Sequence, residues 1–409
     1  MNTSGRLVPR GSRFALVAVV VTALVGCSGG TSGTTGSTSA STTTITTNSA
    51  APSARPLWGE PSDAALPAST VATLQASLKA YMTAHSLTGL SAAVVTPKGS
   101  WAGAAGADGL GTPIQPRSAF AIASTTKTFT AAEVLLLSSR GTIDLDAPVT
   151  KYVSLPFETS GATVRQVATM KSGFPEAPWT TIMAEVAKDP NREWTAAEIV
   201  AKAVDQPRVG TLGGPAKYSG LNYYVLGMVI EKVTGRPLAA ALREDLLAPA
   251  GLDRIWMQTG EKPQPPLAFP VDDPITKVVD PQGGYLPSRG AASTGLGGAG
   301  IAADAPSLAR WGYLLYGGHV IDAGLVTVME TPDPTGEYTY GFGTMITDDN
   351  GTVIVGHAGN FIQYTSIMLV WPDTATSVVV LVPQTGGPEN EARGDLAFEL
   401  YSTLQSAAG

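Results

Sequence analysis

The sequence predicts an α/β fold of the α+β type, in which one antiparallel sheet is flanked by N- and C-terminal helices and a mainly helical lobe is inserted at about 145–310. Three observations predict it. Short apolar segments broken by turn residues lie near both ends of the folded part, helical patterns border them on the outside, and helical patterns dominate the long middle section. Consecutive strands joined by short turns pair antiparallel, so both chain ends should share one sheet.

Length and composition narrow the class of protein. The chain has 409 residues, of which 44% are hydrophobic and 14% charged, and its formal net charge is -7. This composition is typical of a globular protein with a large core, built as one two-lobed domain or as two domains. An acidic chain without a basic face is not expected to bind nucleic acid. No His, Asp and Glu cluster has the spacing of metal ligands, so we expect no metal and no cofactor.

Residues 1–26 have the pattern of an export signal peptide. A basic stretch ends at Arg13, and the apolar run at 14–25 is too short to span a bilayer comfortably. The segment Leu24-Val25-Gly26-Cys27 resembles the lipobox of bacterial lipoproteins, in which the cysteine is lipidated and becomes the N-terminus. Cys27 is the only cysteine, so no disulfide can form within one molecule. The alternative is an ordinary cleaved signal with an incidental cysteine.

The lipoprotein interpretation predicts an exported protein that is held by its lipid on the outer face of the bacterial cytoplasmic membrane. Residues 27–60 are mostly Ser, Thr, Gly and Ala as far as Pro56. Such a segment has little to bury, so it predicts a flexible tether. The folded domain is expected at 61–409.

The elements of the folded domain follow from hydrophobic periodicity and turn chemistry. Apolar residues at helical spacing predict a first helix over 70–85, and a hairpin follows around Pro97-Lys98-Gly99. A Pro- and Gly-rich stretch at 259–300 predicts a long loop over the site. The other expected elements are hairpin strands at 90–95 and 100–105, helices at 195–204, 223–233 and 237–247, strands at 341–346, 352–355, 366–371 and 378–382, and a last helix at 389–404.

Ser124 and Lys127 are the candidate nucleophile and base. They stand just before the apolar run of a predicted buried helix, and a spacing of three places both side chains on one helix face. A serine hydroxyl needs a base to remove its proton, and a lysine can serve if burial keeps its amine neutral. The N–H groups of a helix N-terminus would add donors for developing negative charge. The structural alternative is a capping serine with a solvated lysine.

Five segments carry a family pattern in the same order along the chain. They are 120–130 around the nucleophile, 141–152, the Thr169-Met170-Lys171-Ser172-Gly173-Phe174-Pro175 loop, Lys217-Tyr218-Ser219, and Gly356-His357-Ala358-Gly359. Together they resemble the serine β-lactamase and penicillin-binding-protein superfamily, particularly its class C branch with D-alanyl-D-alanine carboxypeptidase and esterase relatives. The resemblance covers about 67–405 and implies a β-lactamase/transpeptidase-like fold.

The resemblance implies a catalytic role for Tyr218. It makes Tyr218 a proton-relay partner of Lys127 that assists deprotonation of Ser124 and then protonates the leaving group. A phenol titrates near pH ~10, so this role needs a cationic neighbour, which Lys127 can supply. The structural alternative is a half-buried packing tyrosine.

The resemblance also places His357 on the strand that lines the site, where the family has Lys or His. Gly359 would let the substrate backbone approach this strand, and the main-chain N–H of Asn360 would join that of Ser124 in an oxyanion hole. A Ser-His-Asp triad with His357 as the base is the competing chemistry. No Gly-x-Ser-x-Gly pattern surrounds Ser124, which disfavours it.

The sequence departs from the family pattern at positions whose side chains contact the substrate in the family. The family motif Tyr-x-Asn ends here in Gly220, and Asn222 is the nearest residue that could replace the missing amide. Ala358 stands where the family has a Thr or Ser whose hydroxyl would bind a substrate carboxylate. Both changes remove polar contacts to β-lactams while sparing the groups that transfer the acyl group.

These residues predict an exported lipoprotein serine hydrolase that forms an acyl-enzyme and cleaves an ester or a D-amino-acid amide at the cell envelope. The expected substrate is a small molecule or derives from peptidoglycan, and we expect a monomer. The alternatives are a non-catalytic or penicillin-acylable binding lipoprotein with degenerate substrate motifs, and a weak β-lactamase.

Overall fold

The computed structural model describes residues 56–271, 277–332, 339–384 and 393–408. The expected signal peptide, Cys27 and nearly all of the expected tether therefore lie outside the described residues. Within the described ranges, no helix is both long enough and apolar enough to cross a membrane.

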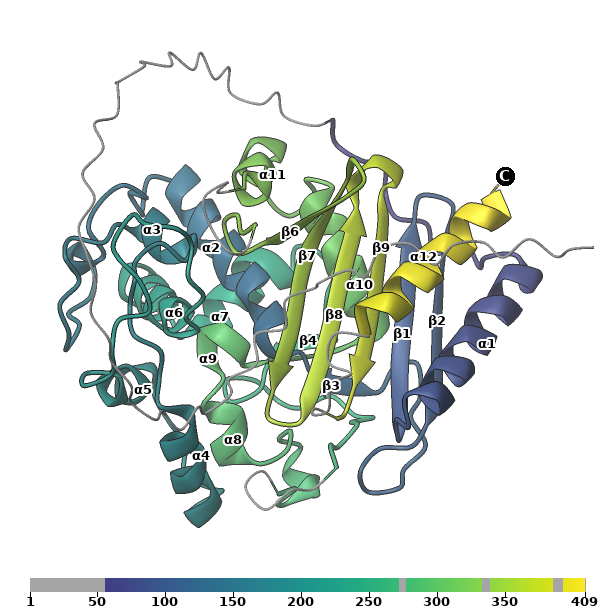
Figure 1. The fold of residues 1–409 in the computed structure, drawn as a ribbon, viewed down its shortest axis with the longest axis horizontal. Coiled ribbons are helices and arrows are strands. Elements are labelled where there is room, and N and C mark those ends of the chain that lie inside the picture. The colour runs from purple at the N-terminus through teal and green to yellow at the C-terminus, as the bar shows by residue number, and fades with distance from the viewer. Residues whose placement is uncertain (1–55, 272–276, 333–338, 385–392, 409) are drawn as a thin grey trace, which may run out of the picture.

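A six-stranded antiparallel sheet joins the two ends of the chain (Figure 1). Its order is β2-β1-β9-β8-β7-β6, so the N-terminal hairpin pairs with the last strand of the C-terminal meander. β8 and β9 are buried along their whole length and are correspondingly apolar, because helices cover both faces of the sheet. The strands are β1 (Gly89–Thr96), β2 (Gly99–Gly106), β6 (Met345–Asp349), β7 (Thr352–Phe361), β8 (Tyr364–Trp371) and β9 (Thr376–Val382).

The two faces of the sheet contribute to two separate hydrophobic cores. α1 (Ala68–Ala84) and α12 (Arg393–Ala408) cover one face, and α10 (Ala305–Tyr316) covers the other (Figure 1). Successive side chains of a strand point to opposite faces, so Val380 of β9 joins the core under α1 and α12, whereas Leu381 joins the larger core shared with the helical lobe. The sheet thus separates the outer helix pair from that lobe.

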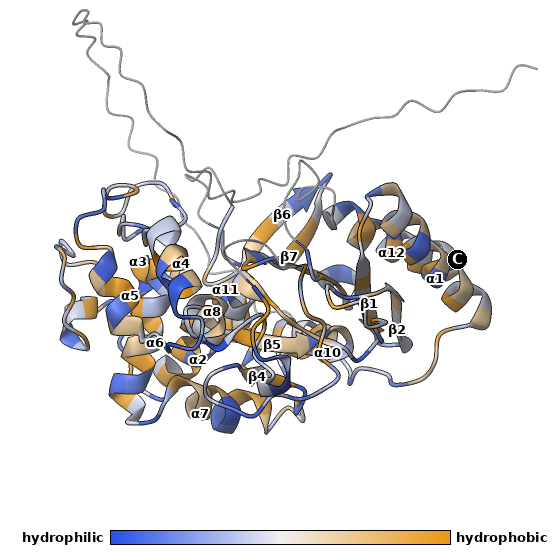
Figure 2. Ribbon diagram, turned by 90° about the horizontal axis from the view of Figure 1, so that it is seen from below, coloured by the Kyte–Doolittle hydropathy of each residue, from blue (hydrophilic) through white to orange (hydrophobic). Residues whose placement is uncertain are grey.

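The helical lobe is built around two buried helices, α2 (Lys127–Ser139) and α6 (Leu221–Thr234). Figure 2 shows this lobe on the opposite side of the molecule from α1 and α12. A small sheet of order β3-β5-β4 carries the chain into and out of the lobe. Its strands are β3 (Ala119–Ala121), β4 (Ile255–Met257) and β5 (Ile301–Asp304), and the other helices are α3 (Val164–Ala168), α4 (Trp179–Lys188), α5 (Ala196–Lys202), α7 (Leu238–Leu242), α8 (Arg289–Ser293), α9 (Leu296–Ala299) and α11 (Ala323–Glu330).

This arrangement confirms the expected α/β fold class, with two local differences. The first is that the strand expected at 341–346 begins only at Met345. Gly341 lies in a close turn before it, where a β carbon would stand 2.0 Å from the Met329 carbonyl oxygen. The apolar pattern predicted a strand in this segment, but it could not show that the first residues of the segment pack against α11 instead.

The second difference concerns the stretch at 259–300, which was expected to be a long loop and instead contains α8 and α9. Glycine disfavours helices, so the sequence of α9 gave no helical signal. The structure requires the glycine at 298 for a different reason: a β carbon on Gly298 would lie 2.7 Å from the ring of Tyr224. The close packing of the α9 backbone against the Tyr224 ring thus overrides the local propensity.

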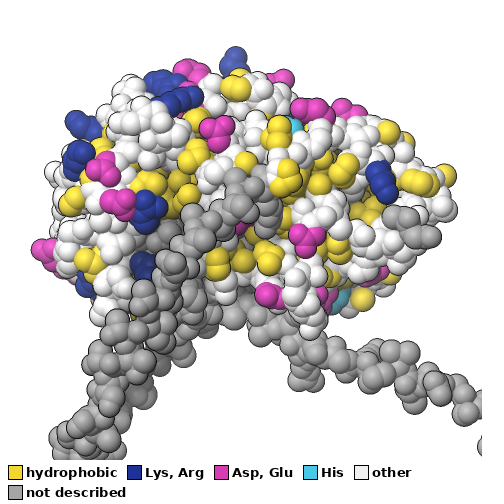
Figure 3. All heavy atoms as spheres, turned by 90° about the horizontal axis from the view of Figure 1, so that it is seen from above, with side chains coloured by type: hydrophobic (Ala, Val, Ile, Leu, Met, Phe, Trp, Pro, Cys, Tyr) yellow, Lys and Arg dark blue, Asp and Glu magenta, His cyan; other side chains and the backbone are white. Residues whose placement is uncertain are grey.

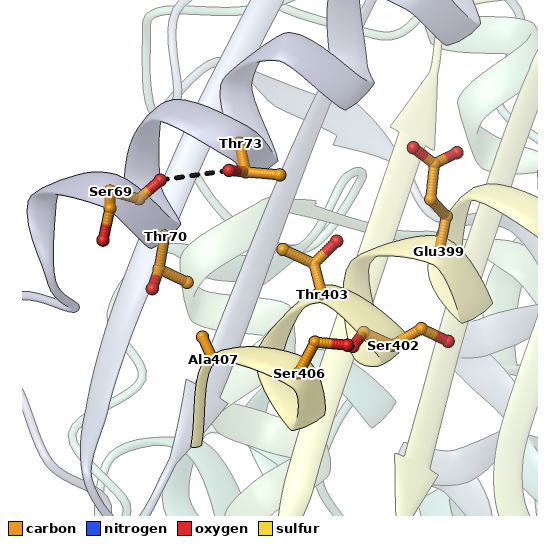
Figure 4. A pocket seen from close by; sticks show the side chains of 8 residues that line it. All are labelled: Ser69, Thr70, Thr73, Glu399, Ser402, Thr403, Ser406 and Ala407. Carbon is orange, nitrogen blue, oxygen red and sulfur yellow. Dashed lines mark hydrogen bonds between the residues drawn. The ribbon is translucent and has the colours of Figure 1, made fainter. Parts of the chain in front are cut away.

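The surface carries charges of both signs. On the face shown in Figure 3, Lys and Arg side chains over the helical lobe are mixed with Asp and Glu rather than gathered into one basic patch. A groove of about 430 Å³ lies between α1 and α12 and is lined mostly by Ser and Thr (Figure 4). Because the sheet separates this groove from the helical lobe, it lies apart from the residues that carry the expected chemistry.

Candidate active site

Ser124 lies in a tight turn between β3 and α2. The turn, η1 (Ala123–Thr126), is a short 3₁₀ helix, and α2 begins directly after it at Lys127. Ala123 has a φ of 49°, a left-handed conformation that is unfavourable for a residue with a β carbon. Such strain persists only where the surroundings impose it, and it concentrates at functional sites. The half-buried Ser124 is therefore held in place by the strained turn and by the helix behind it.

Lys127 is buried against Ser124. Its Nζ donates to Ser124 Oγ at 2.9 Å and to the carbonyl oxygen of Gly298 in α9 at 2.8 Å. Burial lowers the pKa of Lys127 to about 7, while the carboxylate of Glu176 acts in the opposite direction. Near neutral pH a large fraction of the amine is therefore unprotonated and able to accept the proton of Ser124.

Tyr218 reaches the same serine from the loop before α6. Its hydroxyl donates to Ser124 Oγ at 3.0 Å, and Lys127 Nζ lies 5.2 Å from the centre of its ring. Hydrogen bonds to the 170–176 segment hold the loop: Ser219 Oγ donates to the Pro175 carbonyl at 2.8 Å, and the Gly220 N–H donates to the Glu176 carboxylate at 2.6 Å. The structure thus brings the predicted nucleophile, base and proton-relay residue together around one oxygen atom.

His357 lies on β7 and is fully buried. Its Nδ1 is 2.6 Å from the Ala358 carbonyl oxygen, and its Nε2 is 3.1 Å from the Tyr340 hydroxyl. A carbonyl oxygen only accepts, so Nδ1 carries the proton and Nε2 of the neutral ring accepts from Tyr340. Burial lowers the pKa of His357 to about 3, and the charge of Lys127 adds to this effect. Both ring nitrogens are engaged away from Ser124, which argues against His357 as the base of a triad.

The part of β7 that follows Gly356 forms the sheet side of the site. β6 pairs with β7 only as far as Gly356, and η1 packs against β7 beyond that point. Asn360 is exposed there, and the role of its N–H in an oxyanion hole stays a prediction. A β carbon on Gly359 would lie 2.4 Å from Ser366 Oγ and 2.5 Å from the Ile122 carbonyl oxygen, so packing inside the protein already requires a glycine there. The approach of a substrate backbone to this strand stays a prediction.

Gly220 and Asn222 have different surroundings, because Gly220 lies next to the Glu176 carboxylate whereas Asn222 is buried in the helical lobe. Gly220 is the residue before α6, and a β carbon there would meet the Glu176 carboxylate at 3.5 Å. Asn222 is buried, and its amide accepts from Ser172 Oγ at 2.6 Å and donates to the Ser219 carbonyl at 3.1 Å. The expectation that Asn222 offers its amide to a substrate is therefore wrong, because the start of α6 turns this side chain into the lobe.

Three residues of the site were missed by reasoning from the sequence. Glu176 follows the quoted 169–175 loop directly, and its adjacency to that loop was the only available signal. Gly298 lies in a glycine-rich run, and Tyr340 lies just before an expected strand. Each was hidden because its contact is made with a residue distant in the chain.

Among residues 56–271, 277–332, 339–384 and 393–408, no group of three or more His, Cys, Asp or Glu side chains could hold a metal ion.

The sheet with its inserted helical lobe and the Ser-Lys-Tyr cluster together define a serine-hydrolase class of protein. Residues 74–402 match the family model described as Beta-lactamase, and the chain belongs to this family. The match includes η1, α2, the Tyr218 loop and β7.

Two curated proteins are similar to part of the chain. Esterase EstB of Burkholderia gladioli is 31% identical over 156 residues, and penicillin-binding protein 4* of Bacillus subtilis (strain 168) is 27% identical over 155 residues. The matches cover 35% and 34% of this chain and 39% and 31% of those proteins. The chain thus spans well under half the length of either relative.

Solved structures match over a larger share of the chain. A D-stereospecific amidohydrolase from Streptomyces sp. is 26% identical with a TM-score of 0.66, covering 79% of this chain and 97% of that one. A D-amino acid amidase from Ochrobactrum anthropi SV3 complexed with L-phenylalanine amide is 22% identical with a TM-score of 0.69, covering 84% and 100%. The octameric penicillin-binding protein homologue from Pyrococcus abyssi is 24% identical with a TM-score of 0.68, covering 82% and 77%. The last two matches concern the fold alone.

Proposed function

We propose that this chain is an exported, lipid-anchored serine hydrolase that cleaves an ester or a D-amino-acid amide bond through an acyl-enzyme on Ser124. Its substrate would be a small molecule or a fragment of peptidoglycan at the cell envelope. The observation that carries the proposal is the contact of Ser124 Oγ with both Lys127 Nζ and Tyr218 OH. The similarity to an esterase and to a D-stereospecific amidohydrolase supports it.

In the acylation step, the neutral amine of Lys127 takes the proton of Ser124 while Oγ attacks the substrate carbonyl carbon. The developing oxyanion would be held by the N–H groups of Ser124 and Asn360. Tyr218 then gives its proton to the leaving alcohol or amine, and the Lys127 ammonium returns a proton to Tyr218. The products of this step are the acyl-enzyme, the protonated leaving group and a neutral lysine.

In the deacylation step, a water molecule attacks the acyl carbon and gives its proton to the basic Lys127 and Tyr218 pair. Ser124 Oγ leaves and recovers a proton from the same pair. Protons and charges balance over the cycle, so the proposed reaction needs no cofactor. The position of Tyr218, 3.0 Å from Ser124 Oγ, supports this shared use of one relay in both directions.

Export and lipid anchoring belong to the same proposal and rest on the pattern at 1–26 and on Cys27. Metabolic labelling with a clickable fatty acid tests this part separately. We expect label on the wild-type chain and none on Cys27→Ala. Equal labelling of both chains, or no label on either, would overturn the anchor while leaving the hydrolase proposal standing.

A fluorophosphonate probe followed by peptide mapping tests the nucleophile. We expect label on Ser124 in the wild type and none in Ser124→Ala, with folding of the variant checked by its melting curve. Absence of label on Ser124, or equal labelling of both proteins, would reject the hydrolase and favour a non-catalytic binding lipoprotein.

A panel of substrates then separates the candidate activities. Short-chain 4-nitrophenyl esters, a D-Ala-D-Ala peptide and nitrocefin are assayed side by side with the same enzyme preparation. We expect measurable ester hydrolysis and slow or absent turnover of nitrocefin. Rapid nitrocefin hydrolysis would instead assign a β-lactamase and show that Gly220 and Ala358 matter little.

A further inference from the structure

Two buried hydroxyl groups beside the nucleophile have no role in the acyl transfer proposed above. Ser366 lies on β8 and Thr125 lies in η1 directly after Ser124, and both side chains are fully buried. Ser366 Oγ is 2.5 Å from the Ile122 carbonyl oxygen and 2.8 Å from Thr125 Oγ1. These contacts join the chain on both sides of Ser124 to a strand of the six-stranded sheet.

The direction of the two hydrogen bonds follows from the available protons. A carbonyl oxygen only accepts, so the single proton of Ser366 Oγ goes to Ile122, and the Thr125 hydroxyl donates to Ser366 Oγ. The Thr125 hydroxyl also reaches the His357 carbonyl oxygen of β7 at the longer distance of 3.3 Å. We call Ser366 and Thr125 the hydroxyl clamp, because together they tie η1 to β7 and β8.

The hydroxyl clamp acts on a strained turn. Ala123, between Ile122 and Ser124, has a φ of 49°, and a residue with a β carbon keeps this conformation only where its surroundings impose it. The Ile122 carbonyl oxygen accepts from Ser366 Oγ and from the Thr125 N–H, which lies 3.2 Å away. The turn is therefore held from within by its own backbone and from the sheet by Ser366.

Gly359 of β7 makes room for the hydroxyl clamp. It is the cross-strand partner of Ser366, and a β carbon on it would lie 2.4 Å from Ser366 Oγ and 2.5 Å from the Ile122 carbonyl oxygen. A side chain at this position would therefore push these two atoms apart. The contact between η1 and β8 thus passes β7 one residue before Asn360, the predicted second donor of the oxyanion hole.

The hairpin after β7 orients the N–H of Asn360. The two turn residues at 362–363 have φ values of 51° and 62°, as in a type I′ turn, so the closing pair of Phe361 and Tyr364 is hydrogen-bonded. Hydrogen-bonded and non-hydrogen-bonded pairs alternate in an antiparallel ladder, so the next pair, Asn360 and Thr365, is not hydrogen-bonded to each other. The N–H of Asn360 therefore points away from β8, toward the edge of β7 beyond its pairing with β6.

We propose that the hydroxyl clamp sets the spacing between the two donors of the oxyanion hole, the N–H of Ser124 in η1 and the N–H of Asn360 on β7. These groups lie far apart in the chain, and both must point at one oxygen atom to stabilise it. Ser366 and Thr125 are then positioning residues that touch no substrate. The inference rests on the proposed acyl transfer at Ser124, and no covalent bond forms or breaks at the clamp.

Ser366→Ala tests the hydroxyl clamp with 4-nitrophenyl butyrate as the substrate. The active fraction of each protein is first titrated with the fluorophosphonate, so that partial misfolding does not count as a loss of rate. Loss of one oxyanion donor costs about 10²–10³ in kcat, and here the donor is only displaced, so we expect kcat per active site to fall about tenfold or more. KM should change much less than kcat. An unchanged kcat overturns the positioning role.

A trifluoromethyl ketone with the same acyl chain tests the oxyanion hole specifically. Ser124 Oγ adds to its carbonyl carbon, and the resulting oxyanion needs the same donors as the tetrahedral intermediate. We expect its inhibition constant to rise in Ser366→Ala by the same factor by which kcat/KM falls. A fall in kcat/KM with an unchanged inhibition constant would mean that Ser366 acts elsewhere, and it would overturn the proposal.

The matched control is Ser91→Ala on β1. Ser91 and Ser366 are both cross-strand partners of Leu381 on β9, so they lie in one row of the sheet and face the same side. Ser91 is also fully buried, and its Oγ donates to the carbonyl oxygens of Gly103 and Pro116, each 3.3 Å away. We expect Ser91→Ala to keep the wild-type kcat and inhibition constant. Losses as large as those of Ser366→Ala would overturn the assignment to the clamp.

Two variants of Thr125 cover the case in which Ser366→Ala does not fold. Thr125→Val removes the hydroxyl that donates to Ser366 Oγ, whereas Thr125→Ser keeps it. We expect kcat to fall several-fold in Thr125→Val and to stay close to the wild-type value in Thr125→Ser. Equal kcat values in the two variants would contradict the clamp. A wild type without label on Ser124 and without ester turnover would instead reject the hydrolase itself, and the inference with it.

Discussion

Helix α2 carries two buried ionisable side chains, and only one of them faces a reacting group. Lys127, the first residue of the helix, donates to Ser124 Oγ at 2.9 Å. Glu133 is also fully buried, but neither of its carboxylate oxygens has a hydrogen-bond partner of ordinary geometry. Burial lowers the pKa of Lys127 to about 7 and raises the pKa of Glu133 to about 8. A pKa near neutrality therefore marks burial at both sites, and geometry decides which site does chemistry.

The surroundings of Glu133 support a structural role. The carboxylate of Asp245, in the π-helical turn Arg243–Leu247, adds to burial in raising the pKa of Glu133, while Arg140 and Arg236 oppose it. Arg140 and Arg236 both pair with Asp245. Burial and the neighbouring Asp245 carboxylate explain the raised pKa of Glu133 without any contact to a substrate. The two positions therefore predict opposite effects of mutation on activity and on stability.

Lys127→Met should have the largest effect on activity. The methionine fills a similar volume but offers no base, so we expect kcat/KM for a 4-nitrophenyl ester to fall by about 10³-fold, within the range for loss of a general base. Because the variant has no amine whose burial costs solvation free energy, its melting temperature should stay equal to that of the wild type or rise. A variant that keeps more than a tenth of the activity would remove Lys127 from the mechanism.

Tyr218→Phe should have the next largest effect. The ring packing is kept and only the hydroxyl that donates to Ser124 Oγ is lost, so we expect kcat to fall about 10²-fold with an unchanged melting temperature. The comparison of ester and amide substrates sharpens the result, because an amine leaving group needs the proton more than nitrophenolate does. Equal effects on both substrates would contradict the role of Tyr218 as proton donor to the leaving group.

Glu133→Gln should leave activity within about twofold and change the pH dependence of stability. The pKa of Glu133 rises from 4.5 in the unfolded chain to about 8 in the fold, so the folded state holds the proton more tightly. Its contribution to stability is complete below pH 4.5 and is lost as the pH rises through about 8. We expect Glu133→Gln to raise the melting temperature by several degrees at pH 8.5 relative to the wild type, and by less at pH 5.

The control for this prediction is the same pair of proteins assayed for ester hydrolysis at pH 7.5. A strong loss of activity in Glu133→Gln would show that the two buried groups of α2 are coupled. An equal change of melting temperature at both pH values would show that Glu133 is not protonated in the fold.

The fold and the acyl-transfer residues were predictable from the sequence because their signals are local. Alternating apolar residues and turns define the strands, and Ser124 and Lys127 are three residues apart on one helical segment. The contacts that complete the site are not local: Gly298 accepts from Lys127 across 171 positions of the chain. The same holds for Asn222, because its spacing from Tyr218 in the sequence does not reveal that its side chain points into the helical lobe.

The pH dependence of Ser124 acylation tests the central claim most directly, namely that burial keeps Lys127 available as a base near neutral pH. The rate of labelling by a neutral fluorophosphonate is measured from pH 5 to 10 in the wild type and in Glu133→Gln. We expect the rate to rise with pH through a single transition near pH 7 in both proteins, because the pKa of Lys127 is lowered to about 7 and Glu133 is not involved. A transition near the ordinary lysine value of ~10, or one that moves with Glu133→Gln, would contradict the account.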